Sequence, residues 1–244
     1  MQSLLEIYEN HNERSLNKWT HYIEIYEQFF SKYRNSEIVF LEIGIAHGGS
    51  LQMWRKYFGE KALIIGVDVN PECKKFEEEN TKIYIGSQED IVFLEWLKKE
   101  IPKVDVLLDD GGHTMKQQNT TFNVLFEHIK ENGIYVCEDL HTSYWKDYGG
   151  GYKKKSSFIE FSKKFIDNLH AWHATKKDKL KMQNFITDSV FAVHYYDSMI
   201  ILEKRKMNPP VVTFKGHPVL SHHFTDYGQR KSLTKRIKSL LGLQ

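Results

Sequence analysis

Residues 37–50 read EIVFLEIGIAHGGS, an apolar run that passes directly into a glycine-rich loop. The run has the length and composition of a buried strand and predicts one over 37–44. Gly44, Gly48 and Gly49 let the backbone turn tightly and approach a ligand closely. A segment with helical periodicity, SLQMWRKYF, follows at 50–58. The stretch therefore predicts a strand, a tight loop and a helix, which together begin an α/β fold.

Strand-like and helix-like segments continue to alternate along the chain. We predict helices at 19–33, 89–100, 117–133 and 157–171, and strands at 62–69, 81–86, 104–110, 134–139, 189–197 and 198–206. Gly133 is predicted to end the helix 117–133. The last two strands lie a residue or two apart and should form an antiparallel hairpin. Five β-α units before a hairpin predict a doubly wound, mostly parallel sheet with helices on both faces.

Composition limits the class of protein. The chain has 244 residues with 41% hydrophobic content, enough for one large globular domain. No apolar run is long enough to cross a bilayer. The first residues, MQSLLEIYENHNERS, lack the basic start and apolar stretch of a signal peptide. Only two cysteines occur, Cys73 and Cys137, as expected in a reducing compartment. We therefore expect a cytoplasmic protein.

Charge is distributed unevenly although the net charge is only +2. Residues 204–244 contain nine Lys or Arg and one Asp, so a basic tail follows a mildly acidic body. In KSLTKRIKSLLGLQ (231–244) an apolar stripe is flanked by cations, a pattern that can lie on the inner face of an anionic membrane. The favoured alternative is packing on the body or on a second subunit. We divide the chain into a helical lead-in (1–37), a core (38–205) and this tail (206–244).

The first glycine loop indicates a nucleoside ligand. Asp68 ends the second strand, where an acid usually binds ribose hydroxyls. Ala46 stands at the second glycine position of a dinucleotide fingerprint, and Glu42 precedes the first glycine. A carboxylate there repels phosphate and suits an ammonium group, so S-adenosylmethionine fits better than a dinucleotide. A tight turn without any ligand is the alternative.

GSQED (86–90) follows the third strand. Ser87 and Gln88 are placed to bracket an adenine edge. The alternative is that Ser87 is the N-cap of the next helix, with Asp90 three residues on.

Acids follow the fourth and fifth strands, in LLDDGGH (107–113) and IYVCED (134–139). Because these strands are neighbours in this winding, Asp110, Glu138 and Asp139 should converge. Their mutual repulsion calls for a cation, and oxygen ligands suit Mg²⁺ or Ca²⁺. The alternative is that these acids cap helices or bind backbone amides. His113 lies three residues beyond Asp110, where a neutral imidazole could take a proton from a metal-bound hydroxyl.

An aromatic and glycine-rich segment, SYWKDYGGGYKKKSS (143–157), follows the fifth strand. Its flat side chains predict a substrate lid formed by Tyr144, Trp145, Tyr148 and Tyr152. A surface loop without this role is the alternative.

Together, LEIGIAHGGSLQMW, IIGVDVNP, GSQED, VDVLLDDGGH and NGIYVCEDLHTSYW resemble class I S-adenosylmethionine-dependent methyltransferases. Within them, DDGGH with ED resembles the metal-dependent sugar O-methyltransferases, which comprise macrolide-sugar, rhamnosyl and cephalosporin-hydroxylase-like sequences. The resemblance covers about residues 16–204 and implies a Rossmann-like seven-stranded sheet in the order 3-2-1-4-5-7-6 with one antiparallel strand. It further implies that Mg²⁺ is bound by Asp110, Glu138 and Asp139 and that His113 is the base.

The donor residues expected from the loop and the resemblance together are Glu42, Gly44, Ala46, Ser50, Asp68, Ser87, Gln88 and Asp109, the last as a donor contact or a support. The expected activity is methyl transfer to a hydroxyl of a saccharide, either a surface glycan or a glycosylated natural product. No nucleic-acid partner is expected. The alternatives are a hydroxylase-like relative or nicotinamide oxidoreductase of the same fold, and a non-catalytic module for glycan assembly.

Overall fold

The computed structural model describes residues 2–174, 184–217 and 219. The chain divides into two units, residues 1–209 and residues 210–244, of which the first contains all the described helices and strands. In the second unit, residues 210–217 and 219 contain no helix or strand. The amphipathic segment predicted at 231–244 lies outside the described residues. No helix in the described part of the chain combines the length and the apolarity needed to cross a membrane.

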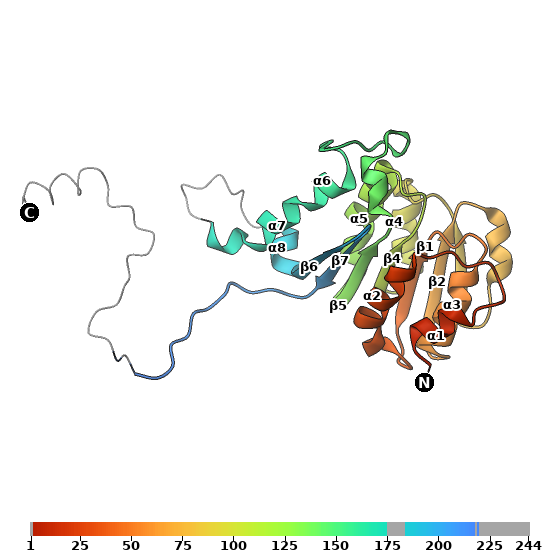
Figure 1. Ribbon diagram of the computed structural model, residues 1–244, viewed down its shortest axis with the longest axis horizontal. Helices are drawn as coiled ribbons and strands as arrows, with labels where there is room; N and C mark the ends of the chain where they lie inside the picture. The colour runs from red at the N-terminus through yellow and green to blue at the C-terminus, as the bar shows by residue number, and fades with distance from the viewer. Residues whose placement is uncertain (1, 175–183, 218, 220–244) are drawn as a thin grey trace, which may run out of the picture. The chain divides into compact units, whose positions relative to one another are not determined.

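A seven-stranded sheet with the order β3-β2-β1-β4-β5-β7-β6 forms the centre of the first unit (Figure 1). The strands are β1 Val39–Ile43, β2 Leu63–Asp68, β3 Thr81–Ile85, β4 Val104–Asp109, β5 Ile129–Cys137, β6 Val190–Tyr196 and β7 Met199–Lys204. Strands β1 to β5 pair in parallel, whereas β7 runs antiparallel to both β5 and β6. The predicted order and the single antiparallel strand are thus confirmed.

Helices cover both faces of the sheet. The α-helices are α1 Leu4–Glu9, α2 Thr20–Phe30, α3 Gly49–Phe58, α4 Ile91–Glu100, α5 Met115–Leu125, α6 Phe158–Ser162, α7 Lys164–Leu169 and α8 Phe185–Ser189. Short 3-10 turns are η1 Ser31–Tyr33, η2 Pro71–Phe76, η3 Phe126–His128, η4 Leu140–Tyr144, η5 Lys146–Tyr148 and η6 Ala171–His173.

Two hydrophobic cores separate these helices by face. Because successive strand residues point to opposite faces, Phe40 packs with α1, α2 and α3, whereas Leu41 packs with α4, α5 and the later helices. Figure 1 shows α1, α2 and α3 lying together on one side of the sheet. The N-terminal helices therefore share a core with the sheet.

The predicted end of the helix 117–133 is wrong. α5 ends at Leu125, and β5 begins at Ile129, so Gly133 lies inside a strand. The pairing register with β4 shifts between Ile129 and Ile134, and Asn132 has a left-handed φ of 68°. Asn132 and Gly133 therefore lie in an irregular part of β5, where the pairing register changes. A Cβ on Gly133 would lie 2.7 Å from the Asp105 carbonyl oxygen, so this part of β5 approaches β4 closely.

Two other local predictions also differ from the structure. Asp90, and not Ser87, is the N-cap of α4, and its carboxylate accepts hydrogen bonds from the amides of Val92 and Phe93 at 2.9 and 3.3 Å. The helix predicted at 157–171 is divided at Lys163 into α6 and α7.

Candidate active site

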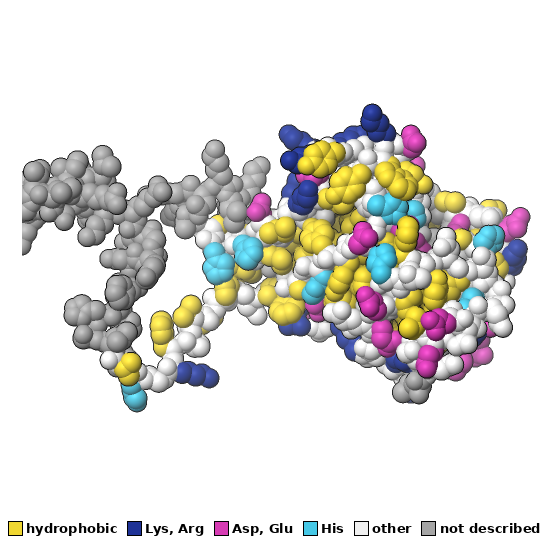
Figure 2. Space-filling model, in the orientation of Figure 1, with side chains coloured by type: hydrophobic (Ala, Val, Ile, Leu, Met, Phe, Trp, Pro, Cys, Tyr) yellow, Lys and Arg dark blue, Asp and Glu magenta, His cyan; other side chains and the backbone are white. Residues whose placement is uncertain are grey.

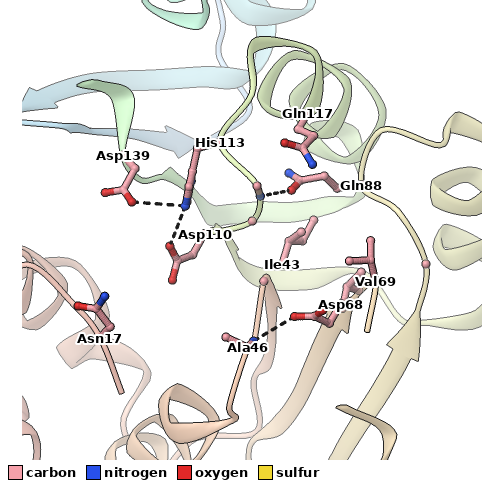
Figure 3. A pocket seen from close by; sticks show the side chains of 15 residues that line it. Asn17, Ile43, Ala46, Asp68, Val69, Gln88, Asp110, His113, Gln117 and Asp139 are labelled. Atoms are coloured by element: carbon pink, nitrogen blue, oxygen red, sulfur yellow. Dashed lines mark hydrogen bonds and ion pairs between the residues drawn. The ribbon is translucent and has the colours of Figure 1, made fainter. Parts of the chain in front are cut away.

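The carboxyl ends of four parallel strands meet at one edge of the sheet. Ile43 of β1 pairs with Val67 of β2 and with Asp109 of β4, which pairs with Cys137 of β5. Open α/β sheets bind ligands at this edge. A cavity of about 400 Å³ lies there, shown in Figure 3, and is lined by Asn17, Ile43, Gly44, Ala46, Val67, Asp68, Val69, Gly86, Gln88, Asp110, Gly111, Gly112, His113, Gln117 and Asp139.

Gly44 allows two strand ends to approach each other at the floor of this cavity. It has a left-handed φ of 86°, and a Cβ at this position would lie 2.1 Å from the carbonyl oxygen of Asp110. The Gly44 amide bonds the Val67 carbonyl at 2.8 Å, and the Asp110 amide bonds the Ile43 carbonyl at 2.9 Å. Only glycine therefore fits between these loops.

Asp68 ties the glycine loop to the end of β2. Its Oδ2 accepts hydrogen bonds from the amides of Ile45 and Ala46 at 3.1 and 3.0 Å, and its Oδ1 accepts one from the Asn70 amide at 2.9 Å. Ala46 has a positive φ of 41°, a conformation that a residue with a Cβ rarely adopts. Asp68 thus fixes the loop while it lines the cavity (Figure 3).

Gln88 is buried and connects the loop after β3 with the loop after β4. Its Oε1 accepts a hydrogen bond from the Gly112 amide at 2.8 Å, and its Nε2 donates to Asp109 Oδ1 at 2.8 Å and to Thr121 Oγ1 at 3.0 Å. Ser87 is not among the residues that line the cavity; its Oγ accepts a hydrogen bond from the Glu89 amide.

Three of the predicted donor residues lie beneath the cavity and do not line it. Glu42 is fully buried and accepts hydrogen bonds from Ser50 Oγ at 2.7 Å and Trp54 Nε1 at 3.3 Å. Burial raises the pKa of Glu42 to about 7, although the nearby Lys18 acts in the opposite direction. Burial likewise raises the pKa of Asp109 to about 6, against the hydrogen bond from Gln88. Glu42, Ser50 and Asp109 therefore support the loops from below.

Asp110, His113 and Asp139 meet at the other side of the cavity (Figure 3). His113 Nε2 lies 3.4 Å from Asp139 Oδ2 and 3.9 Å from Asp110 Oδ1. One ligand atom from each of the three lies within 4.8 Å of the others, a spacing that could hold a metal ion. His113 and Asp139 both have left-handed backbones, with φ of 56° and 55°. Such strain persists where surrounding structure holds it and is common at functional sites.

Glu138, predicted as a third metal ligand, is buried behind this group and already has two partners. Lys18 Nζ lies 2.9 Å from its Oε1, and the Tyr26 hydroxyl donates a hydrogen bond to the same oxygen. Burial and the charge of Asp110 raise the pKa of Glu138, while Lys18 and Tyr26 act against this shift. The three predicted acids therefore converge, but a lysine lies between two of them.

Sequence reasoning missed this lysine and the tyrosines of α2. Tyr22 donates hydrogen bonds to Asp139 Oδ1 at 3.0 Å and to the Ser198 carbonyl at 3.1 Å. Tyr22 and Tyr26 stand four residues apart and so share one face of the helix. Hydroxyls repeated on the buried face of an amphipathic helix were the signal that could have placed this helix at the site.

The predicted lid residues follow β5 and do not line the cavity of Figure 3. Tyr144, Trp145 and Tyr152 are exposed, and the Trp145 ring lies 4.7 Å from that of His141. Amides of Gly150 and Gly151 bond the carbonyls of Trp145 and Ser143, both at 2.8 Å, so the segment is folded. Figure 2 shows hydrophobic and basic side chains gathered on this segment, at the top of the view.

A second cavity, of about 510 Å³, is lined by Asn17, Lys18, Trp19, Thr20, Asp139 and His141. It shares Asn17 and Asp139 with the first cavity. The Trp19 and Trp145 rings lie 6.0 and 4.7 Å from that of His141. Asp139 is therefore reached from both cavities.

Several relatives resemble the chain over most of its length. The 8-demethyl-8-alpha-L-rhamnosyl tetracenomycin-C 2'-O-methyltransferase of Streptomyces olivaceus is 33% identical over 193 residues, which cover 75% of this chain and 50% of the relative. Demethylmacrocin O-methyltransferase of Streptomyces fradiae is 32% identical over 189 residues, which cover 73% of this chain and 47% of the relative. The chain thus spans about half the length of these curated relatives.

A solved structure with the same fold is the MycE methyltransferase from the mycinamycin biosynthetic pathway, in complex with Mg and SAH. It superposes with a TM-score of 0.76 at 26% identity, over 84% of this chain and 55% of MycE. A family model described as FtsJ-like methyltransferase matches residues 13–148, more than half of the chain. The chain therefore belongs to the FtsJ-like methyltransferase family.

Proposed function

We propose that this protein transfers a methyl group from S-adenosylmethionine to a hydroxyl of a saccharide. The observation that carries the proposal is the meeting of His113, Asp110 and Asp139 at the side of the donor cavity. The names of the relatives, which include a rhamnosyl 2'-O-methyltransferase, support a sugar acceptor. The presence of SAH in the MycE complex supports the donor.

The donor cavity fits a nucleoside better than a phosphate. Its volume of about 400 Å³ is typical of small-molecule sites. Its walls include three carboxylates, Asp68, Asp110 and Asp139, and no Lys or Arg among the residues that line it. We place the ribose near Asp68 and the adenine near Gln88. The sulfonium end then lies toward Asp110, where acidic groups favour its positive charge.

The acids beside this cavity also fit a divalent cation. Asp110 and Asp139 supply the oxygen ligands that Mg²⁺ prefers, and His113 lies beside them, within 4.8 Å, where it stays free to accept a proton. A bound Mg²⁺ would lower the pKa of an acceptor hydroxyl and orient it. The presence of Mg in the MycE complex supports this assignment. As the side chains lie here, Glu138 is occupied by Lys18 and Tyr26 and is not free to join them.

His113 is the proposed base. Its Nε2 faces Asp139 at 3.4 Å, and this carboxylate would stabilise the imidazolium that forms when the acceptor hydroxyl loses its proton. Thr142 Oγ1 donates to the His113 carbonyl at 2.9 Å and so fixes its unusual backbone. Transfer also requires that the hydroxyl oxygen approach the methyl carbon in line with the bond to sulfur, and holding both ligands in this geometry favours the reaction.

The acceptor is proposed to enter through the second cavity. Trp19 and Trp145 present exposed rings that both lie near His141, and flat apolar faces are common in ligand sites. Tyr144, Tyr148 and Tyr152 lie on the same segment as Trp145 and would cover a bound saccharide.

Release of S-adenosylhomocysteine, measured against a panel of rhamnosides, other glycosides and nucleotide sugars with Mg²⁺, tests the proposal. Acceptor-dependent release with a methylated saccharide is the expected result. Binding of a glycan without release would instead favour a non-catalytic module. Reduction of a nicotinamide cofactor would favour an oxidoreductase.

A further inference from the structure

The ammonium group of Lys18 lies inside a cage of carboxylates. Its Nζ is 2.5 Å from Asp110 Oδ2, 2.9 Å from Glu138 Oε1 and 3.7 Å from Glu42 Oε1, and its side chain is only 1% exposed. A buried ammonium without partners is costly, and so is a buried carboxylate. Lys18 and the acids therefore stabilise one another.

The two oxygens of Asp110 face two different groups. Oδ1 points toward His113 at 3.9 Å, whereas Oδ2 is bonded to Lys18. Lys18 also holds Glu138 Oε1. The group whose spacing could hold a metal contains His113 and not Glu138, and the ammonium bridges Asp110 and Glu138.

We propose that Lys18 is a built-in counter-ion that competes with a divalent cation for Asp110 and Glu138. This inference rests on the proposed metal site. Without metal, the ammonium holds the acids together; when metal binds, Lys18 leaves Asp110 Oδ2 and Glu138 Oε1 free. The side chain has a flexible four-carbon stem, and Lys18 belongs to the segment 17–20 that lines the second cavity. Lys18 thereby sets a weak, readily reversible metal affinity.

Calorimetric titration of the full chain with Mg²⁺ or Mn²⁺ alone tests the competition. Lys18→Gln keeps a hydrogen-bond donor but removes the charge, and it should bind the ion about tenfold more tightly or better, because no competitor reduces the binding-competent fraction. Lys130→Gln is the matched control, since Lys130 pairs with Asp105 at 2.7 Å away from the site, and its affinity should equal that of the wild type. Affinity of Lys18→Gln equal to or weaker than that of the wild type, or no binding by either, would overturn the proposal.

A second measurement on the wild type covers the case in which Lys18→Gln does not fold. An amine-reactive acetylating reagent, followed by mass spectrometry, reports the accessibility of each lysine. Mg²⁺ should raise modification of Lys18 several-fold and leave that of Lys130 unchanged. Equal modification of Lys18 with and without Mg²⁺ would contradict its displacement. Neither measurement uses the methyl donor or an acceptor, so a failure of the proposed activity would not be confused with a failure of this inference.

Discussion

Lys18 Nζ lies 2.5 Å from Asp110 Oδ2, although 92 positions separate the two residues in the chain. The short segment before α2 thus reaches the loop that follows β4. The acid cluster is consequently formed by both the strand ends and the N-terminal segment.

Metal dependence is tested best with Asp139→Asn. Asparagine tolerates the left-handed φ of 55° at this position, so the backbone should persist while one charge is lost. We expect methyl transfer to fall by at least about 100-fold, comparable to loss of a key catalytic group. Chelation of the wild type should abolish turnover, and Mg²⁺ should restore it. Asp167→Asn, on the exposed face of α7, should retain wild-type turnover. Undiminished activity in excess chelator would exclude the metal.

His113→Asn tests the proposed base. Asparagine is again the replacement because it tolerates the left-handed φ of 56° at this position. Loss of the imidazole should lower kcat by roughly 10²–10⁴-fold, with little change in the dissociation constant of the donor. His170→Asn, an exposed histidine, is the control. A His113→Asn enzyme within about threefold of the wild type would mean that another group accepts the proton.

Gly44→Ala should damage the donor site more than strain alone explains. A left-handed backbone costs alanine about 1–2 kcal/mol, and here the new Cβ would also lie 2.1 Å from the Asp110 carbonyl oxygen. Gly149→Ala is matched, because Gly149 has a φ of 76° and a new Cβ there meets nothing closer than 3.8 Å. Thermal unfolding and donor titration should show a larger loss for Gly44→Ala. Equal losses in the two variants would refute the close approach of these loops.

Glu42 should make stability depend on pH. Its pKa in the folded state is about 7, raised from 4.5 by burial, so the folded protein keeps this proton to a higher pH than the unfolded chain does. Stability from this group is therefore lost as pH rises from about 4.5 to about 7, by at most about 3 kcal/mol. Glu42→Gln should remove that slope, as measured by the difference in denaturant unfolding free energy between pH 5 and pH 8. A difference identical in both proteins would contradict the raised pKa.

The doubly wound, mostly parallel sheet could be predicted from the alternation of strand-like and helix-like segments, whereas the strand order was expected from the resemblance to class I methyltransferases. The edge at which Asp68, Asp110 and Asp139 meet follows from that order. Gly133 was misread because Asn-Gly ends helices and forms bulges alike, and only the pairing of β4 with β5 decides between them.

The positions of Glu42 and Lys18 were harder to predict. Glu42 shares a face of β1 with Phe40, so it lies beneath α3 rather than in the donor cavity. Its hydrogen bonds with Ser50 and Trp54 depend on how α3 packs against the sheet. The contacts of Lys18 join residues 92 and 120 positions apart, and no local pattern marks such a pairing.

The most direct test is transfer of a ¹³C-labelled methyl group from S-adenosylmethionine to a glycoside acceptor in the presence of Mg²⁺, followed by NMR of the product. The expected product carries a ¹³C methyl ether on a saccharide oxygen, is formed together with S-adenosylhomocysteine, and is absent when Mg²⁺ is chelated. Labelled methyl found on nitrogen or on carbon, or formed equally well without the metal, would contradict the proposed function.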